Sequence, residues 1–483
     1  MSISSALDAA NSGLRATSLR AEIVATNVAN ASTPGYVRRS VILSETIVGG
    51  ETQGVRVDGV GQARNAALTQ QRMLSTSDLA QAEVLASAWQ TLSARVGDTA
   101  EGNGIFNEFE RLESALATAV TTPESGTSAI AVLDAAQGII TEFQDLSALS
   151  ENLRAEADRE IAEGVAFVNT SLQQIEELNT RISGIDRTTE QAAAIRDERQ
   201  RLIDGISEYM PVRTVTRNAG KVDLFTPQGV ALLAGSAREI EFSPANTFGP
   251  EHTLASGTLS PLSVDGIELT PGSPDYGALP SGMFAGLFAI RDSDIPTFTS
   301  QLDALAGDLV DRLSADGIDP TTLPGDAGLF YDPDGAATID GLAARLSLNP
   351  AVDPNQGGSS WRLRDGIGAT VQGPPGDSSV LSALYDALTE VRGVDSNGVQ
   401  GAFSATSMAA QITSLTGQTR IQMESVQSSI QAQHRIILDA EQTDSGVDVD
   451  QQMQELLLVE QAYAANARVI QAAQEMIRQL MEI

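Results

Sequence analysis

Apolar residues recur at alternating intervals of four and three at both ends of the chain, the heptad pattern of a helix that packs along another helix. The first stripe runs from Ile3 to Val28 and the second from Val449 to Leu480. Their positions are Ile3, Leu7, Ala10, Leu14, Thr17, Ala21, Val24 and Val28, and Val449, Gln452, Leu456, Val459, Tyr463, Asn466, Ile470, Ala473, Ile477 and Leu480. An unbroken helix over residues 447–483 would be a rod about 55 Å long.

Each stripe is too narrow to stabilise an isolated helix in water. We therefore expect the two terminal helices to form a coiled coil with each other or with neighbouring copies, and to become fully ordered on assembly. The alternative is that both are ordinary core helices of a bundle. The residues we expect at this contact are Ile3, Leu7, Leu14, Ala21 and Val28, and Leu456, Val459, Tyr463, Asn466, Ile470 and Ile477.

The region between the terminal helices contains helical and strand-like patterns. A period near 3.6 predicts helices over about 64–118, 128–208, 288–313 and 404–440. The charged segments "RAEADRE" and "RDERQR" in the second of these are interpreted as solvent-exposed, salt-bridged faces. From Pro211 the period changes to 2, and Asp265–Gly266 between apolar residues is typical of a hairpin turn. Residues 317–400 are rich in Gly, Pro and Asp, which favours short strands and loops.

These elements predict a mainly α fold with β inserts, an α+β multidomain chain whose segments are nested. A nested chain brings its two ends to one pole and its central residues to the other. The expected segments are an N-terminal axial helix and extended arm (1–60), a helical bundle domain in three parts (61–210, 283–316 and 401–445), a small β insert (211–282), a β- and loop-rich outer domain (317–400) and a C-terminal axial helix (446–483).

The composition excludes several classes of protein. The formal net charge is −33, which argues against nucleic acid as a partner because binding a polyanion needs a basic surface. The chain has no cysteine and two histidines, so thiolate catalysis and Cys- or His-based metal sites are not expected. No apolar run approaches the roughly 20 residues of a membrane helix, and the N-terminus lacks the apolar core of a signal peptide. We expect no membrane insertion, and a protein that is cytosolic or exported without a cleaved signal.

The segments that could carry chemistry give weak signals. In "GDAGLFYDPDGAATID", Asp326, Asp332, Asp334 and Asp340 lie close in sequence, and carboxylate-rich loops can bind calcium. The EF-hand pattern fails because Gly335 comes too early and no glutamate follows. An acidic surface turn is the alternative interpretation. Neither "TPQG" nor "GPPG" has the Lys and Ser/Thr of a phosphate-binding loop. The sequence therefore predicts no enzyme, no cofactor and no metal site.

The stretch "NVANASTPGYVRR" marks the end of the first helix. Pro34 disfavours helix at the preceding residue, and Pro34–Gly35 fits the central positions of a type II turn. Asn27 and Asn30 can hydrogen-bond the free carbonyls of the helix end. From Tyr36 the alternation predicts an extended arm. We expect Asn27, Asn30, Pro34, Gly35 and Tyr36 to fix this arm against the next subunit, with an ordinary helix-to-strand connection as the alternative.

The two terminal segments together resemble a known family. "MSISSALDAANSGLRA" followed by "NVANASTPGYVRR", and "VDQQMQELLLVEQAYAANARVIQAAQEMIRQLMEI" at the other end, are similar to the terminal signatures of the bacterial flagellar rod, hook and hook-associated axial proteins. Three internal blocks resemble those of the hook-associated protein 1 family. They are "AIRDERQRLIDGISEYMPVRTVTRNAGKVDLFTPQGVALLAG", "GLFAIRDSDIPTFTSQLDALAGDLVDRL" and "LFYDPDGAATIDGLAARLSLNP".

This resemblance implies a structural subunit of the hook-filament junction. Its expected partners are further copies of itself in a ring, the flagellar hook protein, the second junction protein (hook-associated protein 3) and an export chaperone at the C-terminal helix. It also implies type III export and an extracellular location on the flagellum. Two alternatives remain: the flagellar hook protein itself, and a secreted enzyme carried on the flagellum.

Overall fold

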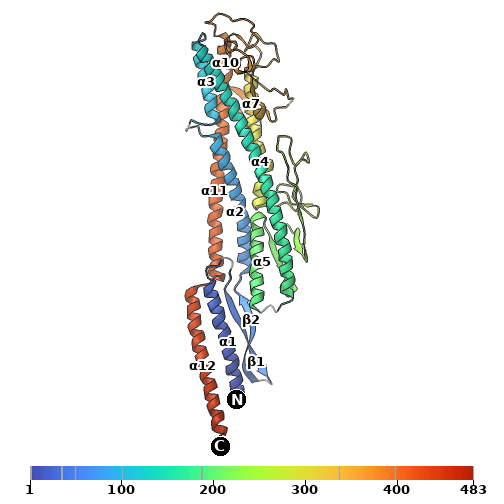
Figure 1. Cartoon of the computed structure of the whole chain (residues 1–483), viewed down its shortest axis with the longest axis vertical. Helices are drawn as coiled ribbons and strands as arrows, with labels where there is room; N and C mark the ends of the chain where they lie inside the picture. Colours follow the sequence, from blue (N-terminus) through green and yellow to red (C-terminus); the bar gives the residue numbers. More distant parts are fainter. Residues whose placement is uncertain are drawn as a thin grey trace.

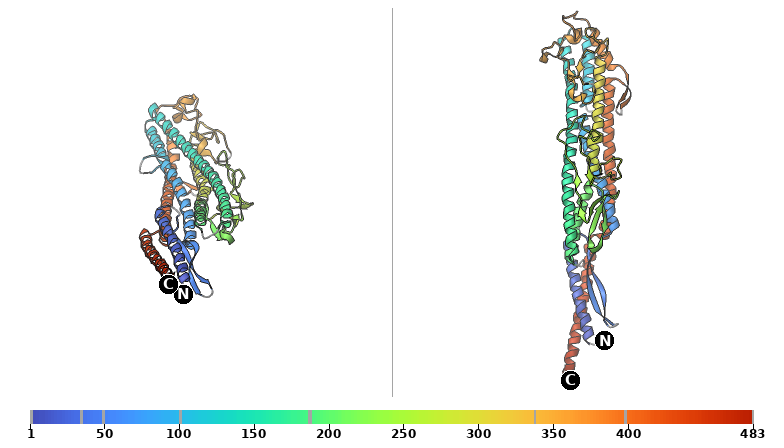
Figure 2. Two further views of the ribbon diagram at one scale, coloured as in Figure 1. Left: turned by 60° about the horizontal axis from the view of Figure 1, so that its bottom comes forward. Right: turned by 90° about the vertical axis from the view of Figure 1, so that its right-hand side faces the viewer.

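The protein is a long rod with both termini at one end (Figures 1 and 2). The computed structural model describes residues 3–33, 36–48, 51–99, 102–185, 189–336, 338–396 and 399–481. The mainly helical architecture with small antiparallel sheets confirms the predicted fold class. The terminal helices lie side by side, as the heptad stripes predict, and they extend beyond the bundle instead of entering its core.

The end that carries the termini consists of two helices and a β-ribbon. These elements are α1 (Ile3–Ala29), β1 (Arg39–Val48), β2 (Glu51–Gln62) and α12 (Val449–Met481), and together we call them the axial module. The two strands pair antiparallel, with Arg39 opposite Gln62 at the base of the ribbon. The extended arm expected after the first helix is thus one strand of a pair. The sequence reasoning missed its partner strand, although "ETQGVRVDGVGQ" contains alternating valines.

The rest of the rod is a bundle of long helices. The expected helix over 64–118 is two helices, because Gly97 and Gly104 adopt positive φ angles that end one helix and precede the next. The expected stretch over 128–208 is also divided in two, and α6 and α7 are joined by a π-helical segment, η2 (Ile290–Asp294). The bundle helices are α2 (Ala66–Val96), α3 (Ile105–Thr121), α4 (Gly126–Ser183), α5 (Glu190–Tyr209), α6 (Met283–Ala289), α7 (Ile295–Leu313), α10 (Ser379–Thr389) and α11 (Ala405–Ser445).

The β insert contains two small antiparallel sheets, one of four strands and one of three. Asp265 and Gly266 have φ angles of 50° and 76°, which confirms the predicted hairpin turn. Its elements are β3 (Arg213–Thr216), η1 (Asn218–Gly220), β4 (Val222–Phe225), β5 (Ala231–Ala234), β6 (Ser236–Ala237), β7 (Ile240–Glu241), β8 (Ser263–Val264) and β9 (Ile267–Glu268). The insert lies along the flank of α4 and not at the far pole, so this part of the nested prediction is wrong (Figure 1). Asn169 and Asn179 of α4 hold it there through hydrogen bonds to the backbone of Ile240 and Val222.

The far end of the rod is formed by α3, α10 and loops from residues 317–378 (Figure 1). Between the loops lie β10 (Phe330–Tyr331), α8 (Leu342–Arg345), β11 (Ser347–Leu348), η3 (Pro354–Gln356), α9 (Arg362–Asp365), β12 (Arg392–Ser396) and β13 (Val399–Phe403). The expectation of short strands and loops over 317–400 misses α10, which packs on α3 and α7 because Val380, Leu381, Leu384 and Leu388 form a buried stripe.

Charged side chains are buried inside the bundle, which corrects the interpretation of two segments as solvent-exposed. In "RAEADRE", Arg154 and Asp158 are 6% and 1% exposed, and in "RDERQR" Asp197 and Arg199 are 8% and 7% exposed. The β insert covers the first pair, and the axial module contacts Asp197. Helical periodicity shows where charges lie on a helix, but it does not show which of them an insert or a second module will cover.

Candidate assembly interface

The contact between α1 and α12 includes a close approach at a glycine. Gly13 lies so close to Asn466 that a β-carbon at this position would be 2.8 Å from the Asn466 amide nitrogen. Gly54 brings β2 equally close to α1, and the amide of Val55 donates to the Ser12 hydroxyl at 3.2 Å. The buried apolar residues of the module are Ala10, Ala16, Ile23, Val24, Val60, Val459 and Ala473. This small core is separate from the large core of the bundle.

The predicted contact residues differ in how deeply they are buried. Val459 is buried, whereas Tyr463 is 51% exposed and therefore is not part of the buried contact between α1 and α12. The side chain of Ile3, together with Pro34 and Gly35, lies outside the described residues. The remaining members are partly buried: Leu7, Leu14, Ala21, Val28, Leu456, Asn466, Ile470 and Ile477.

Asn27 connects several elements of the axial module, and its side chain is 1% exposed. Its amide nitrogen donates to the Arg39 carbonyl at 2.9 Å and to the Gln452 side-chain oxygen at 2.8 Å. Its oxygen accepts from the Tyr36 hydroxyl at 2.8 Å and from the Arg39 amide at 3.0 Å. Asn27 thus joins α1, β1 and α12, and the prediction that it hydrogen-bonds a helix carbonyl is wrong. Burial raises the pKa of the Tyr36 hydroxyl, which keeps it protonated as a donor.

Asn30 does satisfy a carbonyl of the helix end, as predicted. Its side chain donates to the Thr26 carbonyl at 2.9 Å, and its oxygen accepts from the Thr33 hydroxyl at 3.2 Å. The amide of Tyr36 donates to the carbonyl of Thr33 at 3.1 Å. Thr33 and Tyr36 are thus joined by a backbone hydrogen bond, and the Tyr36 hydroxyl reaches Asn27.

The base of the ribbon is bound to α5 of the bundle, and Asp197 accepts most of these hydrogen bonds. Asp197 accepts from Gln62 at 2.7 Å, from Arg39 at 3.0 Å and from Arg64 at 3.3 Å. The Arg39 guanidinium also stacks on the Tyr36 ring, 4.9 Å from its centroid, and lies 3.7 Å from Glu190. Burial lowers the pKa of Arg64, and Asp197 opposes that shift.

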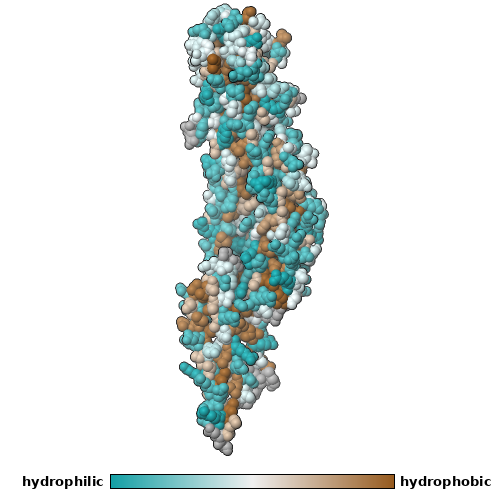
Figure 3. Space-filling model, in the orientation of Figure 1, coloured by the Kyte–Doolittle hydropathy of each residue, from teal (hydrophilic) through white to brown (hydrophobic). Residues whose placement is uncertain are grey.

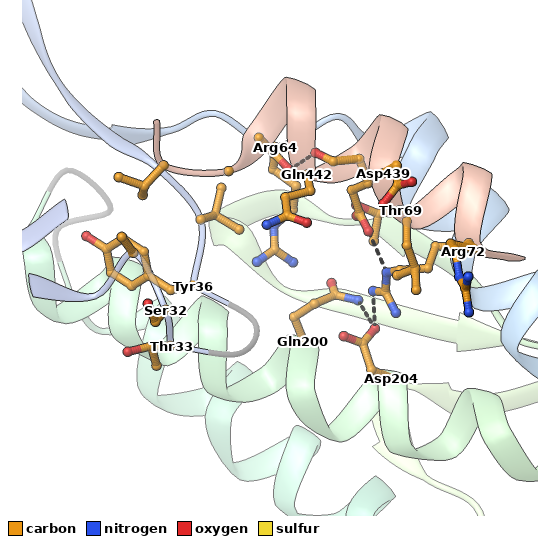
Figure 4. Close-up of a pocket in the computed structure, with 18 residues that line it drawn as sticks. Ser32, Thr33, Tyr36, Arg64, Thr69, Arg72, Gln200, Asp204, Asp439 and Gln442 are labelled. Atoms are coloured by element: carbon orange, nitrogen blue, oxygen red, sulfur yellow. Dashed lines mark hydrogen bonds and ion pairs between the residues drawn. The ribbon is translucent and has the colours of Figure 1, made fainter. Parts of the chain in front are cut away.

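A cleft lies beside this base, where the axial module meets α2, α5 and α11 (Figure 4). Arg72 of α2 extends into it and forms ion pairs of 2.6 Å with Asp204 of α5 and with Glu441 of α11. Thr69 donates to Glu441 at 2.6 Å, and Gln200 donates to Asp204 at 2.8 Å. These contacts hold the bundle helices together at the junction.

The outer face of α12 is apolar and exposed. Leu457 and Leu458 are 57% and 59% exposed, and Val469 and Met476 are 45% and 46% exposed. Figure 3 shows a brown surface over the first half of α12. On the ribbon, Ile42 and Ile47 are 48% and 64% exposed. Large apolar side chains on a module with such a small core are typical of a surface that another protein covers.

The acidic loop at residues 326–340 forms internal contacts. Asp332 binds Arg345 at 3.0 Å, and Asp326 accepts from the Leu323 amide at 2.7 Å. Within the described residues, no group of three or more His, Cys, Asp or Glu side chains is arranged to hold a metal ion. No helix in the described part of the chain is both long enough and apolar enough to span a bilayer.

Sequence reasoning missed Asp197, Gln62, Arg64 and Gln452 as connecting residues. Gln452 lies on the heptad stripe, where a polar residue among apolar ones signals a specific buried hydrogen bond. Asp197 has no signal of its own, because its partners are far away in sequence.

Family models match the centre and both ends of the chain. Residues 95–329 match the model described as "Flagellar hook-associated protein FlgK helical domain". Residues 7–36 match "Flagella basal body rod protein", and residues 442–483 match "Flagellar basal body rod FlgEFG protein C-terminal". The terminal matches coincide with α1 and α12, and the central match covers α3 to α7.

Curated relatives match along the whole chain. The chain is 22% identical over 505 residues to Flagellar hook-associated protein 1 of Bacillus subtilis (strain 168), covering 98% of this chain and 96% of that protein. It is 21% identical over 562 residues to Flagellar hook-associated protein 1 of Escherichia coli (strain K12), with 100% of both chains covered. The protein of the same name from Salmonella typhimurium (strain LT2) is 24% identical over 65% of this chain and 56% of that protein. The helical-domain match, both terminal matches and these relatives agree, and along its whole length the chain is similar to flagellar hook-associated protein 1.

Proposed function

We propose that this protein is a structural subunit of the junction between the flagellar hook and filament, and that it assembles through its axial module after type III export. Its partners would be further copies of itself in a ring, the hook protein and the second junction protein. An export chaperone would cover the C-terminal helix before secretion. The family match carries the flagellar role, and the exposed apolar face of α12 supports assembly through this module.

The outer face of α12 has the spacing of a second helix-packing surface. Residues on it follow the same alternation of four and three as the face toward α1. They are Leu458, Ala462, Ala465, Val469, Ala472 and Met476. One face of α12 therefore packs within the chain, and the other offers large residues separated by alanines, over which a neighbouring helix can approach closely. Burying such a face stabilises assembly by about 25 cal/mol per Å² of apolar surface.

Substitutions on this outer face test the proposal. Leu458→Glu with Val469→Glu would place two charges on the exposed stripe, whereas Gln461→Glu with Gln474→Glu would add the same charge at exposed polar positions of the same helix. We expect both variants to have the far-UV circular dichroism and thermal midpoint of the parent. Cells carrying only the first variant should make hooks without attached filaments in electron micrographs, and cells with the second should be motile. Normal filaments with the first variant would contradict assembly through this face.

The copy number of the protein in the flagellum distinguishes the junction role from the alternative, in which the protein is the hook subunit. A hook contains many more subunits than a junction ring, so quantitative mass spectrometry of purified hook-basal bodies gives clearly different copy numbers for the two. We expect a small number of copies, located at the distal end of the hook by antibody labelling. A copy number equal to that of the hook subunit would contradict the junction role and support the hook role.

A further inference from the structure

Two short connections join the axial module to the bundle. Residues 63–65 link β2 to α2, and residues 446–448 link α11 to α12. Arg38 lies between them: its carbonyl accepts from the amide of Ala63 at 2.9 Å, and its amide donates to the carbonyl of Ser445 at 3.0 Å. Two folded parts that are joined only by short connections can rotate about the axis that passes through those connections. Side-chain contacts at a distance from this axis can fix the angle between the two parts. The contacts that fix this angle decide the shape of the rod.

The side-chain contacts described between the ribbon and the bundle converge on the first turns of α5. Arg39 and Gln62, which face each other at the base of the ribbon, both bind Asp197. Gln62 also donates to the Ala193 carbonyl at 3.3 Å and accepts from Arg196 at 3.0 Å. One helix turn therefore holds both strands.

Asp197 is the charge on which this arrangement depends. It is 8% exposed and carries the only negative charge among the described hydrogen-bond partners of Arg39 and Arg64 at this point. The Arg39 side chain is 10% exposed. Without Asp197, two guanidinium groups would lie close together with little solvent to screen them, and removing one partner of a buried ion pair leaves the other uncompensated. Glu190, at 3.7 Å from Arg39 and 42% exposed, would compensate only in part.

The adjoining cleft supplies room for movement. It lies between the turn at Ser32 and Thr33 on the axial side and α11 on the bundle side (Figure 4). Asp197, Gln200 and Asp204 share one face of α5, at intervals of three and four. Asp197 binds the axial module and Asp204 binds Arg72 of the bundle. Two carboxylates on one helix face therefore bind different parts of the molecule.

We infer that Asp197 with Arg39, Gln62 and Arg64 forms a latch that fixes the angle between the axial module and the bundle, and that the two connections become a hinge when the latch opens. The latch is a property of the single chain and does not depend on the proposed flagellar role. It would let one subunit adopt more than one angle at its base, with the carboxylate of Asp197 as the control point. Closing it requires one ion-pair cluster to form, and opening it leaves both folded parts intact.

Distance measurements between spin labels test the latch. The chain has no cysteine, so Ser428→Cys in α11 and Gln454→Cys in α12 are the only thiols to label, and both positions are exposed. We expect a narrow distance distribution in the parent. In Asp197→Asn the distribution should broaden and its maximum shift by several ångströms, with unchanged helix content. The matched control is Asp204→Asn, which alters an ion pair inside the bundle and should keep the narrow distribution.

A second variant guards against misfolding of the first. Arg39→Gln opens the latch from the axial side and leaves Asp197 paired with Arg64, so we expect a smaller shift in the same direction. Distributions for Asp197→Asn and Arg39→Gln that match the parent would overturn the latch. So would a parent distribution that is already as broad as that of Asp197→Asn, or an equal broadening in Asp204→Asn.

Discussion

The axial module and the helical bundle differ in how much of their large apolar surface they bury. The bundle encloses large apolar residues and, among the described residues, buries four arginines, Arg154, Arg199, Arg291 and Arg312, whose guanidinium groups are bonded to carboxylates and carbonyls. The axial module buries only a few apolar residues, none larger than Ile23, together with Thr17, Asn27 and Gln452, and it exposes leucine, valine and methionine on α12. The bundle therefore covers most of its large apolar residues within the chain, whereas the axial module leaves much of its apolar surface exposed.

The largest loss of stability should come from the buried ion pairs of the bundle. Arg291 is fully buried and donates to Asp158 at 2.6 Å, to Asp292 at 2.9 Å and to the Ser260 carbonyl at 3.1 Å. Arg291→Met leaves two buried carboxylates without their cation, so the free energy of unfolding should fall by about 3–5 kcal/mol. Urea denaturation followed by circular dichroism measures this.

The control for Arg291 is an arginine of α4 that faces solvent. Arg159 binds Glu156 and Glu163 of its own helix, and Arg159→Met should leave the denaturation midpoint near that of the parent because exposed pairs contribute little. If Arg291→Met is as stable as this control, the buried cluster does not stabilise the bundle.

The next largest effect should be local to the axial module. Asn27→Ala removes the partner of the Tyr36 hydroxyl, the Arg39 amide and the Gln452 side chain, at a cost of about 1–3 kcal/mol. Because the two cores are separate, hydrogen exchange should become faster in α1 and the first half of α12 and stay unchanged in α4. Asn30→Ala, which loses mainly one bond to the Thr26 carbonyl, should change exchange much less. Equal acceleration throughout the rod would show that the two regions unfold together.

The far end of the rod and the bundle should respond differently to low pH. Hydrogen bonds from Arg345 and Arg364 lower the pKa of Asp332 and of Asp365, whereas burial raises the pKa of Asp292 and Asp303 in the bundle. A carboxylate with a lowered folded pKa stabilises the fold above its unfolded pKa, near 3.9, and that stabilisation is lost as the pH falls through the folded pKa. The raised pKa values have the opposite sign, because those groups bind protons more readily in the folded state.

Trp361, beside α9, reports this acid step. In a Trp89→Phe background it is the only tryptophan, and its fluorescence should change below about pH 4 while the far-UV helix signal persists. Asp365→Asn should give the acid-type fluorescence already at neutral pH. Simultaneous loss of fluorescence and helix signal would mean that the loops and the bundle respond to acid as one unit.

The sequence predicts helices and turns better than it predicts contacts between residues that are distant along the chain. Heptad spacing is a local signal, so the residues of α1 and α12 alone indicate both helices and the contact between them. Glycine and hairpin signals likewise locate the turn at Asp265. The partners of Asn27, Asp158 and Asp197 are distant in sequence, and no pattern along one helix identifies them. The heptad pattern does not predict that Tyr463 is exposed, because a stripe defines a helix face only to within about one residue.

Adding one methyl group at a close approach of helices should affect stability differently in the two regions, and the smaller effect is expected in the axial module. At Gly13 the new β-carbon would lie 2.8 Å from the end of the Asn466 side chain, which can rotate away. Alanine also favours helix over glycine by about 0.5–1 kcal/mol. Gly13→Ala should therefore change stability by less than about 1 kcal/mol, and Gly13→Ala with Asn466→Ala should be more stable than the parent.

Gly164 of α4 gives the matched test in the bundle. Its β-carbon would lie 2.7 Å from the rings of both Tyr209 and Phe284, which contact each other with centroids 5.5 Å apart. Rings packed in this way cannot rotate aside, so Gly164→Ala should destabilise the protein by about 1–3 kcal/mol despite the gain in helix propensity. Thermal denaturation of both variants compares them directly. Stabilisation at Gly164 or clear destabilisation at Gly13 would contradict the distinction, because the rigid contacts would then belong to the axial module and the adaptable ones to the bundle.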